Sequence, residues 1–88
     1  MERTVQIVNR LGLHARAAAK LVTLATEFES DVKVRKGNRE VSGKSIMGVM
    51  MLAAAKGSEI TLIAEGADAD AALTEMAALV ANRFGEDS

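Results

Sequence analysis

The stretch Asp31-Val-Lys-Val-Arg-Lys-Gly-Asn-Arg-Glu-Val-Ser42 decides the fold of this chain. Valines alternate with charged residues on either side of Gly37-Asn38, and such alternation is typical of a strand with one buried face. Glycine and asparagine both tolerate a positive φ, so this pair favours the tight turn of a β-hairpin. We therefore predict two antiparallel strands, Asp31–Lys36 and Arg39–Ser42.

Two further stretches alternate in the same way. Thr4–Val8 directs Val5 and Ile7 to one face, and Ser58–Ala64 repeats the pattern nearer the end of the sequence. Period-two alternation with β-branched residues indicates strands, so we expect four strands in total.

Three segments show helical spacing instead. Residues 15–28 predict a helix, a short helix is expected over Ser45–Ala54, and a third is expected to begin at Asp68 or Asp70 as N-cap. Residues 85–88 are expected to fray. The expected buried stripes are Ala18, Leu21, Val22, Ala25 and Phe28 in the first helix, and Leu73, Met76, Leu79, Val80 and Phe84 in the last.

The resulting order, β-α-β-β-α-β-α, belongs to the α+β class. Because the strands alternate, one face of the sheet is expected to be covered by all three helices and the other to face water. A chain of 88 residues has room for one core, so we expect a single domain over residues 1–88.

Composition excludes several function classes. The chain has no cysteine and one histidine, which removes disulfides, thiolate metal sites and Cys nucleophiles. A net charge of −1, with two Phe as the only aromatics, argues against nucleic-acid binding. The polar start at Met1-Glu-Arg-Thr indicates no signal peptide, and no apolar run is long enough to span a bilayer. We expect a cytoplasmic protein without metal or cofactor.

The single histidine, His14, stands where the predicted loop meets the first helix. At a helix start the first backbone N–H groups are unpaired, and with the helix dipole they form an anion site. Arg16 adds forked donors that suit phosphate oxygens. The positive helix end favours neutral imidazole, the nucleophilic form. Taken alone, His-x-Arg also fits a polar cap beside a solvated arginine.

The segment Gly43-Lys-Ser-Ile-Met-Gly-Val-Met50 is the second candidate. It is not a phosphate-binding P-loop, because that motif needs a glycine at position 38, where this chain has Asn. Ser45 is expected to be an N-cap. The helix after it is apolar all round, so part of it must be exposed. An exposed Met-rich surface fits either a docking role or methionines that merely pack against their neighbours.

Together the two segments are similar to the histidine-containing phosphocarrier family, HPr, of the bacterial phosphotransferase system. Val8-Asn-Arg-Leu-Gly-Leu-His-Ala-Arg-Ala-Ala18 resembles its active-site signature, and the Gly43 segment resembles its regulatory-serine region. The resemblance covers essentially the whole chain. It implies an open-faced β-sandwich with a four-stranded antiparallel sheet of order 1-4-2-3 and three helices on one face.

The resemblance also implies a function. Enzyme I, charged by phosphoenolpyruvate, is expected to phosphorylate His14 on Nδ1, with Arg16 at the active site, and an enzyme IIA protein is expected to receive the group. Ser45 matches the serine that HPr kinase/phosphorylase modifies. Docking is expected at Ile46, Met47 and Met50. Such a chain is a carrier rather than an enzyme, and we expect it to be a monomer because His14 must stay accessible.

One residue departs from the family pattern. The family usually has Pro where this chain has Ala17, and relatives in the nitrogen-type branch often resemble this Ala-rich version. Sugar uptake and a regulatory nitrogen-branch role therefore both stay open. A regulatory binding protein of the same fold, acting through Ser45 and the methionines, is a further alternative. A ferredoxin-like small-ligand sensor would differ in strand order.

Overall fold

The predicted hairpin is present in the computed structural model, which describes residues 1–88. Strand β2 (Asp31–Lys36) pairs antiparallel with β3 (Arg39–Ser42), with Val34 opposite Val41. Gly37 has φ 58°, so the turn uses the left-handed conformation that glycine accepts without strain.

The remaining strands complete one sheet. Strand β4 (Glu59–Glu65) lies between β1 (Glu2–Gln6) and β2, which gives the order β1-β4-β2-β3 with every pair antiparallel. Along β4, Ile60, Leu62 and Ala64 are buried while the residues between them are more exposed. The α+β fold class and the strand order 1-4-2-3 are confirmed.

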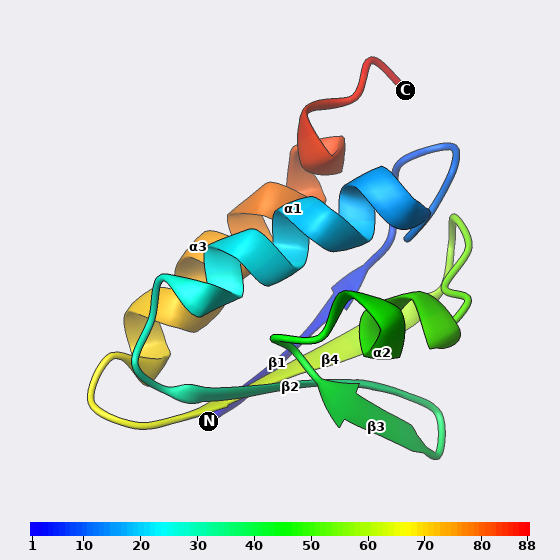
Figure 1. Ribbon diagram of the computed structural model, residues 1–88. Helices are drawn as coiled ribbons and strands as arrows, with labels where there is room; N and C mark the ends of the chain where they lie inside the picture. The colour runs from blue at the N-terminus through cyan, green and yellow to red at the C-terminus, as the bar shows by residue number, and fades with distance from the viewer.

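Three helices cover the buried face of this sheet. Helix α1 (Ala15–Thr26) lies beside α3 (Ala69–Ala81), and the short α2 (Ile46–Met51) contacts α1 and β3 (Figure 1). A 3₁₀ turn, η1 (Arg83–Gly85), follows α3. The single core of 21 buried residues lies between the helices and the sheet. Its largest fully buried side chains include Phe84, Ile7, Leu21 and Ile60.

The open face of the sheet is polar. Arg35 on β2 forms ion pairs with Glu2 at 3.3 Å and with Glu40 at 3.9 Å. The hydroxyls of Thr4 and Thr61 share a hydrogen bond of 3.0 Å between β1 and β4. These contacts agree with the expectation of one wet face. No helix of the chain is long and apolar enough to cross a membrane.

Several predicted element ends were wrong. The first strand ends at Gln6 rather than Val8, because β4 starts at Glu59 and leaves Ile7 to bond with the turn residues Gly57 and Ser58. The second helix ends at Met51 rather than Ala54, since Ala53 adopts φ 49° and turns the chain.

The ends of the other two helices also differ from expectation. Helix α1 ends at Thr26, so Phe28 lies in the following loop, where it is half-buried against the core. Asp68 occupies the N-cap position of α3, but its side chain makes no capping bond. Its carboxylate instead accepts hydrogen bonds from Glu29 and Ser30, in the loop before β2. In both places, long-range packing outweighs the local pattern.

Candidate functional site

The loop before α1 is shaped by Gly12. This residue has φ 67°, and a Cβ there would come within 2.5 Å of the Ala54 carbonyl oxygen, so both conformation and space require glycine. The backbone N–H of Leu13 donates to the same Ala54 oxygen at 2.9 Å. The loop is thereby fixed against the segment that follows α2, and this positions the next residue, His14.

His14 is the N-cap of α1, as predicted. Its backbone is extended, with φ −71° and ψ 177°, and its side chain makes no capping hydrogen bond. The first N–H groups of α1 therefore have no partner from the cap. The imidazole is 28% exposed. An accessible ring thus stands beside free N–H donors at the positive end of a helix dipole, an arrangement that attracts anions.

The imidazole has one hydrogen-bond partner, and sequence reasoning missed it. Nε2 of His14 lies 2.5 Å from Oε2 of Glu86, while Oε1 of Glu86 accepts a bond of 3.0 Å from the Asn9 amide. The hydrogen bond from His14, reinforced by the one from Asn9, holds the pKa of Glu86 below its usual value. The expectation that residues 85–88 fray was wrong for Glu86, which is only 17% exposed.

No local pattern marks Glu86 as a site residue. The contact with His14 joins residues 72 positions apart in the sequence. The only sequence signal is that Phe84, part of the predicted buried stripe of the last helix, must be anchored in the core, which holds the residues after it close to the molecule.

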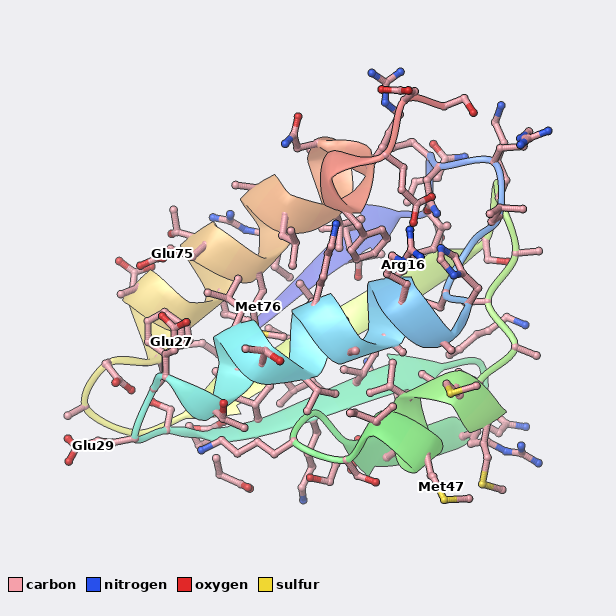
Figure 2. The ribbon with its side chains drawn as sticks, turned by 45° about the horizontal axis from the view of Figure 1, so that its top comes forward. Arg16, Glu27, Glu29, Met47, Glu75 and Met76 are labelled. Atoms are coloured by element: carbon pink, nitrogen blue, oxygen red, sulfur yellow. The ribbon has the colours of Figure 1, made fainter.

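His14 and Arg16 line one shallow pocket. Its volume is about 220 Å³, and it is lined by Arg10, Leu11, His14, Arg16, Glu86, Asp87 and Ser88. Arg16 is exposed at the start of α1 and forms no hydrogen bond or ion pair (Figure 2). Its guanidinium is free to bind an incoming anion. A larger groove of about 390 Å³ runs along α1 to Leu79 and does not include His14.

Ser45 occupies the predicted N-cap position of α2. Its hydroxyl oxygen accepts a hydrogen bond of 3.1 Å from the backbone N–H of Gly48. Met47, the most exposed of the large apolar residues, points away from the body of the molecule in Figure 2. The predicted docking residues Ile46, Met47 and Met50 are 42%, 75% and 41% exposed.

Two exposed apolar residues were not predicted as docking residues. Met51 is 61% exposed and Leu11, in the wall of the His14 pocket, is 60% exposed. The structure thus brings His14 and Arg16 into one pocket, adds Leu11 to the wall of that pocket, and leaves Ser45 and the α2 methionines outside it. No group of three or more His, Cys, Asp or Glu side chains is arranged to hold a metal ion.

Known proteins that are similar to this chain are phosphocarriers of one family. The family model described as the PTS HPr component phosphorylation site matches residues 1–82. Phosphocarrier protein HPr of Cupriavidus necator is 55% identical over 98% of this chain and 97% of its own length. Phosphocarrier protein NPr of Shewanella violacea is 48% identical over 100% and 97%. A crystal structure of HPr from Thermoanaerobacter tengcongensis superposes with a TM-score of 0.95 at 42% identity, covering 100% of this chain and 99% of that one.

Proposed function

The chain belongs to the HPr family of phosphotransferase-system phosphocarriers, and we propose that His14 accepts a phosphoryl group from phosphoenolpyruvate-charged Enzyme I and passes it to an enzyme IIA protein. Proteins of this family carry a phosphoryl group between other proteins and are not enzymes. The observation that carries the proposal is the accessible, unique imidazole at the N-cap of α1, in one pocket with the unpaired guanidinium of Arg16.

The chemistry follows from that placement. The lone pair of a neutral His14 ring nitrogen forms the new N–P bond, and the bond between phosphorus and its donor breaks with its electron pair returning to the donor. Arg16 binds phosphoryl oxygens through its fork of N–H donors. Ala17 keeps a backbone N–H in the first turn, which a proline there would lack, so one more donor faces the transferred group.

Docking is assigned in this proposal to Ile46, Met47 and Met50. These exposed apolar side chains lose water when a partner covers them, and methionine adapts to surfaces of different shape. Ser45, at the start of the same helix, is the proposed site of regulatory phosphorylation by an HPr kinase/phosphorylase. The carrier acts as a monomer in the cytoplasm, where these partners meet it, as one domain over residues 1–88.

A role in the nitrogen-type branch is the second candidate. Ala17, which replaces the usual proline, favours it, and one relative at 48% identity is named NPr. The branch is tested by offering the phosphorylated carrier to an enzyme IIA of each type. Faster transfer to the nitrogen-type acceptor is the result expected for that branch, and faster transfer to a sugar-type acceptor assigns sugar uptake.

The carrier function is tested with phosphoenolpyruvate and purified Enzyme I, followed by mass measurement. We expect the chain to gain one acid-labile phosphoryl group and His14→Ala to gain none while keeping its circular dichroism spectrum. His14 is the only histidine, so an unchanged gain in the variant would place the group elsewhere and end the proposal.

A further inference from the structure

The ring of His14 has two nitrogens, and the structure treats them differently. Nε2 is bonded to the Glu86 carboxylate, whereas Nδ1 has no hydrogen-bond partner. An ionised carboxylate can only accept, and the low pKa of Glu86 keeps it ionised at neutral pH. The proton must therefore sit on Nε2. In a neutral imidazole only one nitrogen carries a proton, so Nδ1 holds the lone pair.

Glu86 is itself held in place. The Asn9 amide, which is fully buried, donates to Glu86 Oε1 at 3.0 Å and to the Gly12 carbonyl at 2.8 Å. Asn9 thus joins the carboxylate to the loop that carries His14. Its own side-chain oxygen is buried without a partner, which leaves the amide nitrogen facing the two acceptors. The carboxylate is bound on both oxygens, so it fixes the ring rather than merely lying near it.

The backbone leading to Glu86 is strained in a way that points to a function. Arg83 and Phe84 have φ values of 57° and 54°, in the left-handed region that non-glycine residues rarely adopt. Such conformations persist only where the surroundings enforce them, and they cluster at functional sites. Here the enforcing contacts are the fully buried ring of Phe84 and a 2.7 Å hydrogen bond from Lys20 on α1 to the Phe84 carbonyl.

Figure 1 shows where the segment after this turn lies. The segment after α3 lies at the same end of the molecule as the start of α1, and Glu86 in this segment contacts His14. Had the chain continued as a helix beyond Ala81, its next residues would have run on along the axis of α3. The turn at residues 83–85 therefore delivers Glu86 to His14.

From these contacts we propose that Glu86 is a positioning residue, which holds the His14 ring with Nε2 protonated and its Nδ1 lone pair free to receive the phosphoryl group. The proposal rests on the carrier function assigned to His14. In serine proteases, a carboxylate bonded to one nitrogen of the histidine ring holds the proton there, so that the other nitrogen keeps its lone pair. Here the roles of the two nitrogens are exchanged, since the carboxylate occupies Nε2.

The proton on Nε2 also matters after the first transfer. When Nδ1 forms the N–P bond, no proton moves, and the ring becomes a cation whose Nε2–H faces the Glu86 carboxylate. When the group passes on, the P–N bond breaks with its electron pair returning to Nδ1. The ring then leaves as neutral imidazole. Without a carboxylate on Nε2 the proton is held less firmly, and an imidazolate would be a poorer leaving group.

The first test uses the unphosphorylated protein, so it does not depend on the carrier function. In proton–nitrogen NMR spectra, the wild type is expected to show an Nε2-bound ring proton that is protected from exchange with water. Glu86→Ala should lose this signal. Glu75→Ala removes the same charge from an exposed residue on α3, outside the His14 pocket, and should keep it. Absence of a protected ring proton in the wild type, or its survival in Glu86→Ala, would refute the proposal.

The second test measures phosphorylation by Enzyme I. Loss of a charged hydrogen-bond partner predicts that Glu86→Ala lowers kcat by about tenfold with little change in KM, since the docking residues are intact. Glu86→Gln still offers an acceptor oxygen and should recover part of the rate, and Glu75→Ala, which lies outside the pocket, should match the wild type. A rate that is unchanged or faster in Glu86→Ala would show that the carboxylate does not assist. If wild-type His14 took no phosphoryl group at all, the carrier proposal would fail while the NMR result stood.

Discussion

Arg16 makes no contact that stabilises the folded chain. It is exposed on the first turn of α1 and has no partner in the protein, so its guanidinium stabilises nothing in the folded chain. Surface residues of this kind usually change stability by less than about 0.5 kcal/mol when substituted. A large effect of its removal on transfer would therefore support the role in phosphoryl binding that we propose for it.

We expect Arg16→Ala to slow phosphorylation by Enzyme I while leaving unfolding unchanged. A charged hydrogen bond to phosphate contributes about 1.5–3 kcal/mol, which corresponds to a rate loss of roughly ten- to a hundredfold. Arg16→Lys keeps the charge but loses the planar fork, so its rate should fall between the two. Stopped-flow transfer rates and urea unfolding curves provide the measurements. Equal transfer rates for all three proteins would reduce Arg16 to a solvated side chain.

At this scale the sequence predicted the position of His14 at the start of α1 but not its contact with Glu86. His14 could be placed because Gly12 and the helical stripe that starts after it lie within a few residues. Glu86 could not be placed, because its position depends on the left-handed turn at Arg83-Phe84, and nothing in the local residue types requires φ above zero there. Leu11 was missed for a related reason, since only the fold shows that it lines the His14 pocket.

The sequence predicted whether each element is a helix or a strand more accurately than the residues at which it begins and ends. All four strands and three helices follow from alternation or helical spacing, because burial on one face is a local requirement. Their ends depend on neighbours that the local pattern does not contain. Asp68 shows this most clearly, because a residue type that favours capping was recruited by a loop 38 residues earlier in the sequence.

The contact of Asp68 with that loop predicts a pH-dependent stability. The Ser30 hydroxyl, followed by the Glu29 backbone N–H, donates to the carboxylate and lowers the pKa of Asp68 below 3.8. A carboxyl whose pKa is lower in the folded state stabilises the protein above its unfolded value and loses that effect as pH falls through the folded value. The contribution of Asp68 should therefore be full at neutral pH and disappear in acid below about pH 4.

Urea unfolding of Asp68→Ala at several pH values tests this. The variant should be less stable than the wild type at pH 7, and the difference should narrow as the pH falls below 3.8. Asp70→Ala is the matched control, because Asp70 lies in the first turn of the same helix and accepts no side-chain hydrogen bond from the loop. A stability difference for Asp68→Ala that persists undiminished in acid would mean that the carboxylate charge is not what joins the loop to α3.

For the molecule as a whole, the residues that form the core differ from those that we propose for docking. The core consists of side chains between the sheet and the helices, whereas Ile46, Met47 and Met50 remain largely outside it. Exposed apolar groups of this size are favourable only when another surface covers them. Changes on the outer side of α2 should therefore alter partner binding without altering the fold.

Ser45→Asp separates the two properties. An aspartate at the N-cap can accept the bond from the Gly48 N–H that the Ser45 hydroxyl accepts now, and a negative charge suits a helix start. The melting temperature should therefore scarcely change. Docking should suffer, because the new charge lies beside Ile46 and Met47 and must lose water, without a partner, when Enzyme I covers them. Phosphorylation of His14 should then slow at sub-saturating carrier concentration.

The matched control is Thr74→Asp, which adds the same charge at an exposed position on α3. If the charge acts only through the net charge of the carrier, both variants should slow equally, and added salt should abolish both effects. If it acts by burial at the docking surface, only Ser45→Asp should slow, and raising the carrier concentration should restore its rate. Equal rates for Ser45→Asp and the wild type would remove the docking surface from α2 and leave Ser45 as a helix cap alone.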